Sequence, residues 1–115
     1  MKDRREESFA RLHHIIKSIE EIEKFTRGYS EKEFIENAVL SSAVLFHFTL
    51  IGEAVIHVEQ KILNKYNYPW HQVRAFRNLI AHEYFNIKLS AVWQTITTDI
   101  QKFKSTVQAI LESEF

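Results

Sequence analysis

The sequence contains no cysteine, one proline and two glycines among its 115 residues. Without cysteine the chain has no disulfide, no thiolate metal site and no cysteine nucleophile. Turns between strands consume glycine and proline, so their scarcity favours a few long helices over a sheet. The formal net charge is zero, which excludes a strongly basic nucleic-acid binder. If the protein acts on RNA, it needs a local positive cleft, which two subunits could build together.

What is present is typical of a folded protein. Apolar residues make up 45% of the chain and charged residues 26%, and the length predicts one domain over residues 1–115. The charged N-terminus, residues 1–7, lacks the apolar core of a secretory signal. The apolar stretch 38–56 is long enough to suggest a membrane span, but it contains His47 and Glu53, which are costly at mid-bilayer. We therefore expect a buried bundle helix, no membrane association and a cytoplasmic location.

The hydrophobic pattern predicts four helices. In the first, over residues 4–27, apolar residues recur at steps of three and four, and Gly28 is placed to end the helix in a left-handed conformation. Ser30 and Glu33 have the spacing of a capping box that starts a second helix. Pro69 suits the first turn of a third helix, which should end near Tyr84. The last helix should cover residues 90–112, and the whole should form an all-α, antiparallel four-helix bundle.

The second predicted helix is unusually long. Its apolar pattern continues without a break to Tyr66, which would make a helix of about 34 residues and roughly 50 Å. That length exceeds a compact domain of this size, so we expect the helix to kink or to protrude. Its apolar residues also occupy more than one face. In so small a domain a second copy of the chain would most easily bury the extra face, which predicts a homodimer.

Most familiar catalytic motifs are missing, including a glycine-rich phosphate loop and clustered carboxylates. The histidines at positions 13, 14, 47 and 57 are interpreted as structural or surface residues. The remaining candidate is the segment from Arg77 to Tyr84. Asn78 and His82 share a helix face at the i, i+4 spacing. Arg77 and His82 are about 140° apart on an ideal helix, so they converge only through the length of arginine, the helix end or a second subunit.

These side chains suit RNA cleavage. A histidine titrates near neutral pH, so His82 can take the proton of a ribose 2′-hydroxyl or give one to the leaving oxygen. The fork of Arg77 matches phosphate oxygens and can stabilise the charge that develops there, and Asn78 can hold the histidine or the substrate. With the 2′-hydroxyl as nucleophile, no metal or cofactor is needed, and DNA is inert. The same residues are also ordinary on an amphipathic helix, so spacing alone does not establish catalysis.

A wider pattern surrounds this segment, and its parts occur in a fixed order along the chain. The parts are Arg11-x-x-His14-Ile15, Phe25-Thr26-x-Gly28, Ile51-Gly52-Glu53-Ala54, Tyr68-Pro69-Trp70, Arg77-Asn78, His82-x-Tyr84-Phe85, Val92-Trp93 and Asp99. The arginine, polar residue and following histidine resemble the motif of the HEPN superfamily. The whole order and spacing is similar to the HepT-like toxin family, and the similarity covers nearly the entire chain.

The resemblance implies a HEPN-like helical bundle that dimerises and forms an RNase cleft across the dimer. Arg77 and His82 would be the catalytic pair, with Asn78 in support. It also implies a toxin–antitoxin system in which an MntA-type nucleotidyltransferase antitoxin transfers AMP to Tyr84, placing a bulky anion beside His82. Glu83 departs from the family pattern, because a small residue is common there. Its carboxylate would either weaken RNA binding or point to solvent.

The sequence thus predicts a metal-independent endoribonuclease toxin that cleaves tRNA or mRNA. The alternative is a non-catalytic subunit that binds a nucleotidyltransferase and presents substrate or Tyr84 to it. A dimeric structural bundle without chemistry is a third possibility.

Overall fold

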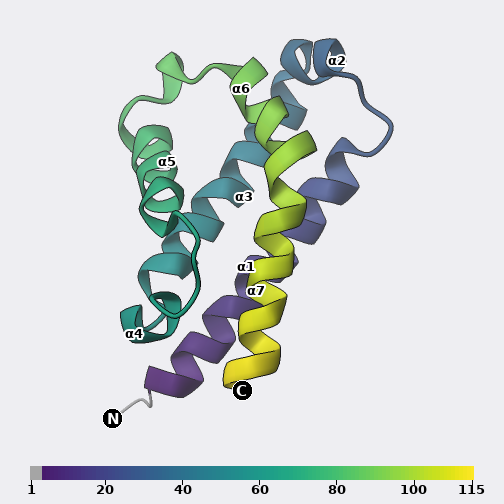
Figure 1. Cartoon of the computed structure of the whole chain (residues 1–115). Coiled ribbons are helices and arrows are strands. Elements are labelled where there is room, and N and C mark those ends of the chain that lie inside the picture. The colour runs from purple at the N-terminus through teal and green to yellow at the C-terminus, as the bar shows by residue number, and fades with distance from the viewer. Residues whose placement is uncertain (1–3) are drawn as a thin grey trace.

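A computed structural model of the chain describes residues 4–115, and these form an all-α fold without strands (Figure 1), as predicted. The helical segments in chain order are α1 (Arg4–Thr26), α2 (Glu31–Glu36), α3 (Ala38–Ile56), α4 (Gln60–Leu63), α5 (Trp70–His82), the 3₁₀ turn η1 (Tyr84–Asn86), α6 (Leu89–Gln94), the π-helical turn η2 (Thr95–Asp99) and α7 (Ile100–Glu114).

The turn between α1 and α2 has the predicted geometry. Gly28 adopts φ +82°, a left-handed conformation that glycine takes without steric cost. The capping box is present: the Ser30 hydroxyl accepts a hydrogen bond from the Glu33 backbone N–H at 3.1 Å, and the Ser30 N–H donates to the Glu33 carboxylate at 2.9 Å. Local side-chain chemistry therefore fixes where α1 ends and α2 begins.

The long second helix, for which we expected a kink or a protruding end, is instead divided into the three helices α2, α3 and α4. The side chain of Asn37 accepts a hydrogen bond from the Leu40 N–H at 3.0 Å, and the Asn37 backbone is extended, so this residue caps a new helix instead of continuing the old one. A second break follows α3, where the Glu59 N–H donates to the buried Ser8 hydroxyl of α1 at 3.0 Å. The two breaks divide the long apolar segment into the shorter helices α2, α3 and α4, which fit within a molecule 44 Å long.

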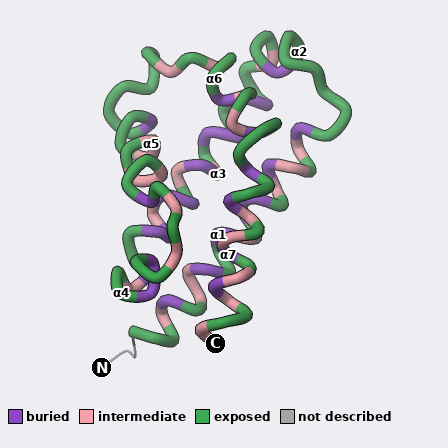
Figure 2. The backbone as a smooth tube through the Cα atoms, in the orientation of Figure 1, coloured by how far each residue is buried: buried purple, intermediate pink, exposed green. Residues whose placement is uncertain are grey.

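The core helix of the bundle is α3, which packs against α1 on one side and α5 on the other, while α7 packs on α1. Figure 2 shows that the buried positions recur along these helices and alternate with exposed ones. By length and composition, α3 is also a helix that could cross a membrane. In this structure it is the bundle-core helix that the sequence predicted.

The predicted last helix is one helical run with a π-helical interruption, since α6, η2 and α7 follow one another directly. The hydroxyls of Thr95, Thr97 and Thr98 donate to carbonyl groups one turn back, at 2.7–3.2 Å. Such bonds compete with the regular helical ladder. At its far end α7 returns to the start of α1, where the rings of Phe9 and Phe115 lie 5.2 Å apart.

Candidate active site

Helix α5 carries the predicted catalytic residues. Its first residue, Trp70, is buried and donates its indole N–H to the carbonyl of Leu63 at 3.0 Å, while Pro69 precedes the helix as N-cap. Helix α5 then runs along α3 and ends at His82 near the upper end of the bundle in Figure 1, opposite both chain termini. The anchored start thus determines which end of the bundle presents the candidate site.

Arg77 is held by close approach of α5 to α3. A Cβ atom at Gly52 would collide with the Cβ of Arg77 and would lie 2.8 Å from its Cγ, so only glycine leaves room for this side chain. The Nη2 of Arg77 donates to the Glu53 carboxylate at 3.2 Å, and its Nη1 donates to the Asn78 side-chain oxygen at 3.0 Å. The guanidinium has five N–H donors, so this arrangement leaves donors for a further acceptor.

The Nε–H of Arg77 has no hydrogen-bond partner among residues 4–115, although the atom is buried. Burying a donor without a partner costs free energy. The side chain as a whole is 27% exposed, so part of it remains accessible from solvent although its Nε is buried. An anionic ligand at this head would find a charged group that the protein has already oriented.

Asn78 has a different contact from the one its spacing suggested. We expected it to share a face with His82 and to hold the histidine or the substrate. In the structure its side-chain oxygen accepts the hydrogen bond from Arg77, and no hydrogen bond joins it to His82 within the described chain. Asn78 therefore helps to orient the arginine.

His82 is the last residue of α5 and is exposed. Within residues 4–115 its side chain forms no hydrogen bond or ion pair, whereas the Arg77 guanidinium pairs with Glu53 and Asn78. The two residues lie on the same helix, but the monomer does not bring them into direct interaction. Their convergence through the length of arginine, the helix end or a second subunit stays a prediction.

The turn after α5 is braced by several contacts. The Glu83 N–H donates to the Leu79 carbonyl at 2.7 Å, and the Asn86 side-chain amide donates to the Glu83 carboxylate at 2.6 Å. The hydroxyls of Tyr84 and Ser42 of α3 lie 3.1 Å apart. The Glu83 carboxylate is therefore folded over the turn η1, and Tyr84 is 42% exposed beside His82.

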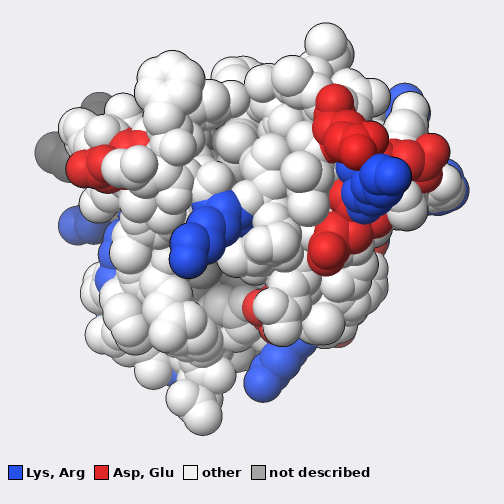
Figure 3. Space-filling model, turned by 90° about the horizontal axis from the view of Figure 1, so that it is seen from above, with Lys and Arg blue, Asp and Glu red and all other residues white. Residues whose placement is uncertain are grey.

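Charge is unevenly distributed over the end of the molecule that carries η1, α6 and α2. Figure 3, which views this end, shows the largest group of acidic side chains at the edge near α2, where Glu31, Glu33 and Glu36 lie. The remaining surface in this view is mostly uncharged, with isolated basic groups and smaller acidic groups, one of them at the opposite edge. A polyanion approaching this end would meet less repulsion away from α2.

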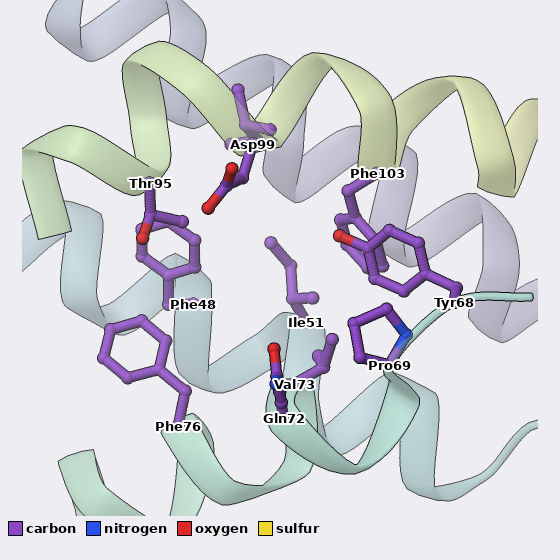
Figure 4. A pocket seen from close by; sticks show the side chains of 11 residues that line it. Phe48, Ile51, Tyr68, Pro69, Gln72, Val73, Phe76, Thr95, Asp99 and Phe103 are labelled. Carbon is purple, nitrogen blue, oxygen red and sulfur yellow. The ribbon is translucent and has the colours of Figure 1, made fainter. Parts of the chain in front are cut away.

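A separate cavity of about 220 Å³ lies between α3, α5 and α7 (Figure 4). Two aromatic pairs line it, Phe48 with Phe76 and Tyr68 with Phe103, each with ring centres 5.2 Å apart. Burial and the nearby Asp99 carboxylate raise the pKa of Tyr68. The sequence analysis did not predict this cavity, and none of the predicted catalytic side chains line it.

The other histidines agree with their structural interpretation where the contacts are known. The ring of His47 lies 3.4 Å from the Ser18 hydroxyl, and burial lowers the pKa of His47 below its ordinary value, partly opposed by Glu21. His13 packs edge-on against Phe9. In the described part of the chain no three side chains of histidine, cysteine, aspartate or glutamate gather as a potential metal site.

Comparison with known proteins identifies the family. The family model described as "Ribonuclease HepT-like" matches residues 15–110. The chain belongs to the HepT-like ribonuclease family. Both the resemblance drawn from the motifs and the prediction of an RNA-cleaving enzyme are thereby confirmed at the level of the family. No solved structure matches the chain.

Curated relatives of this HepT-like chain come from archaea and bacteria. It is 33% identical to a "Gamma-glutamylcyclotransferase and putative RNase" of Methanocaldococcus jannaschii over 88% of its own length, and spans 46% of that longer protein. A "Putative RNase" of Caldanaerobacter subterraneus is 30% identical, with 90% of this chain and 93% of the relative covered. A "Probable ribonuclease HepT" of Thermococcus cleftensis is 27% identical over 86% and 91% of the two chains.

Proposed function

We propose that this HepT-like protein is a metal-independent endoribonuclease toxin in which Arg77 and His82 act on one phosphodiester of a tRNA or mRNA. The observation that carries the proposal is the guanidinium of Arg77, which Glu53 and Asn78 orient while spare donors remain. An oriented, partly exposed arginine is suited to binding a phosphate through two parallel hydrogen bonds. His82 supplies an exposed imidazole on the same helix.

In the proposed reaction the ribose 2′-oxygen attacks phosphorus and the bond to the 5′-oxygen of the next nucleotide breaks. The products are a 2′,3′-cyclic phosphate and a free 5′-hydroxyl. A neutral His82 takes the proton from the 2′-hydroxyl, and a protonated histidine gives one to the departing 5′-oxygen. Arg77 stabilises the charge that grows on the phosphoryl oxygens during the step.

The proposed cleft includes a second copy of the chain. Val39, Phe46 and Leu50 follow one another at steps of seven and four along α3, and they are 82%, 59% and 37% exposed. The same strip of α3 contains Ser42, which contacts Tyr84, and Glu53, which pairs with Arg77. A homodimer formed over this apolar strip would therefore place the two Arg77–His82 sites next to each other, and each copy could supply one of the two histidine roles.

Tyr84 is the proposed acceptor of AMP from an MntA-type nucleotidyltransferase antitoxin. Its ring is partly exposed, its hydroxyl contacts only the exposed Ser42 among the described residues, and it lies two positions from His82. An adenylyl group at this hydroxyl would add a negative charge and considerable bulk beside the histidine. It would repel the RNA phosphate and fill the space that the substrate needs.

The deciding experiment is RNA cleavage by the unmodified protein in excess EDTA, after the intact mass has shown that no AMP is attached. We expect cleavage with a cyclic-phosphate end, and loss of cleavage in His82→Ala and Arg77→Ala. His71→Ala, which removes an exposed histidine from the first turn of the same helix, is the matched control and should cleave normally. A folded, AMP-free dimer that leaves tRNA and mRNA intact would instead favour a non-catalytic partner of the nucleotidyltransferase.

The Tyr84→Phe variant tests the regulatory part of the proposal. It keeps the ring but removes the hydroxyl that would accept AMP, so we expect it to cleave RNA and to remain active after incubation with the nucleotidyltransferase and ATP. The wild-type protein should gain the mass of AMP and lose activity under the same conditions. If the variant gains AMP as readily as the wild type, the acceptor is another residue.

A further inference from the structure

Phe85 is the most exposed large apolar residue described in the structure, with 98% of its surface open to solvent. Single exposed apolar residues are common, but a whole phenyl ring projecting beside a candidate catalytic histidine is a more specific feature. Phe85 is the middle residue of η1, three positions after His82. The ring of Tyr84 packs against it edge-on, with ring centres 5.6 Å apart.

The turn that carries Phe85 is held in place, so the ring projects from a fixed backbone. The Glu83 N–H bonds to the last turn of α5, and the Asn86 N–H donates to the Glu83 carbonyl at 2.9 Å. The Asn86 side chain closes the turn through the Glu83 carboxylate, and Tyr84 contacts α3 through Ser42. Because the backbone is already held, only the side-chain rotations of Phe85 are lost when a flat partner stacks on its ring.

A groove of about 370 Å³ begins at the residues that follow Phe85. It is lined by Phe76, Leu79, Asn86, Ile87, Lys88, Ala91, Val92 and Thr95. Most of this lining is apolar, and Lys88 adds a cation that forms no ion pair within residues 4–115. An aromatic ring, an apolar groove and an unpaired cation side by side are the elements from which single-stranded nucleic-acid sites are built.

We propose that Phe85 stacks on a nucleobase next to the scissile phosphate, while Lys88 binds a neighbouring phosphate of the same RNA strand. This inference rests on the proposed ribonuclease function. Single-stranded RNA is recognised largely by stacking of unpaired bases on aromatic side chains. A protein with zero net charge gains little affinity from phosphate contacts alone, so stacking supplies a larger share of its binding.

Binding to a short fluorescent oligouridylate tests the proposal directly. His82→Ala serves as the background, because it prevents cleavage during the measurement. Adding Phe85→Ala should weaken binding about 5- to 100-fold, the range that loss of one base–aromatic stack produces. Phe85→Trp should retain affinity, whereas Phe85→Leu, which is apolar but has no π-face, should not. Tyr29→Ala removes another exposed aromatic ring, far along the chain, and should bind normally.

Two further readouts separate the possible outcomes. In the same His82→Ala background, an oligonucleotide with an abasic site next to the cleavage position should bind equally with and without Phe85→Ala, because the stacking partner is absent. Equal affinity for the intact oligouridylate with and without Phe85→Ala would overturn the proposal. A Phe85→Ala protein that light scattering shows to be a monomer would also overturn it, because Phe85 would then be a contact between two copies of the chain. Failure of the wild type to cleave RNA would overturn the ribonuclease function, while the binding comparison would still decide whether Phe85 stacks.

Discussion

Gly52 determines the position of Arg77 although it has no side chain of its own. A Cβ added at this position would meet the Cβ and the Cγ of Arg77, the latter at 2.8 Å, and neither atom is at the flexible end of the side chain. Alanine is a better helix former than glycine by about 1 kcal/mol, but this gain cannot offset a clash between two packed helices. The ion pair with Glu53 depends on the same close approach.

Gly52→Ala is therefore expected to lower the free energy of unfolding by about 1–3 kcal/mol, because overpacking forces α3 and α5 apart. RNA cleavage should fall further than stability alone explains, since Arg77 moves with α5. Chemical denaturation and cleavage assays at a temperature where the variant is folded would measure both effects. Gly28→Ala is the contrasting variant. A Cβ added at Gly28 would meet no atom within 4 Å, so this variant loses stability only through its left-handed backbone. It should cleave RNA normally when folded.

At the residue scale the sequence indicates which side chains are candidates for the site, but not which residues they contact. Arg77 and His82 lie in one short segment, so a local pattern is enough to single them out. The partner of Arg77, Glu53, is 24 positions away on another helix, and its role cannot be inferred from a local pattern. Asn78 was assigned to the wrong neighbour because helix periodicity ignores the reach of the adjacent arginine. The exposure of Phe85 depends on how η1 turns away from the core, which periodicity also does not describe.

Helix boundaries show the same limit at the scale of elements. The apolar repeat continues through Asn37 and beyond Ile56, so periodicity predicted one helix where the structure has α2, α3 and α4. The breaks depend on side-chain hydrogen bonds, such as that between Asn37 and the Leu40 N–H, which are each worth about 1 kcal/mol. Where glycine or a complete capping box marks a boundary, as at Gly28 and Ser30, the prediction was correct.

Asn37→Ala should destabilise the protein by about 1 kcal/mol, because the first turn of α3 loses its capping acceptor. Asn37→Asp keeps an acceptor at the same place and should be close to wild type. Thermal unfolding followed by circular dichroism would measure the difference. An alanine variant as stable as the aspartate variant would show that α2 and α3 are separated by tertiary packing and not by the cap.

At the scale of the whole molecule, the exposed apolar strip of α3 is the surface that the proposed homodimer would cover. Phe46→Glu places a charge in the middle of this strip, and we expect a folded monomer with RNA cleavage reduced at least tenfold, since burying an unpaired charge in a dimer is costly. Light scattering gives the mass and circular dichroism the helix content. Ser105→Glu adds the same charge at an exposed position of α7 and should remain dimeric. A dimer that persists in Phe46→Glu would place the contact elsewhere.

Both ends of the described chain lie at one pole of the bundle, and the residues proposed for catalysis lie toward the other. Besides the packing of Phe9 on Phe115, the last turn of α7 is tied to the segment before α5 by the ion pair of Lys65 with Glu114 at 2.9 Å. A polypeptide joined at either end would thus emerge away from η1. The bundle can be appended to another protein without the attached part covering the end that carries the proposed site, and fluorescent or affinity tags at either end should leave cleavage measurable.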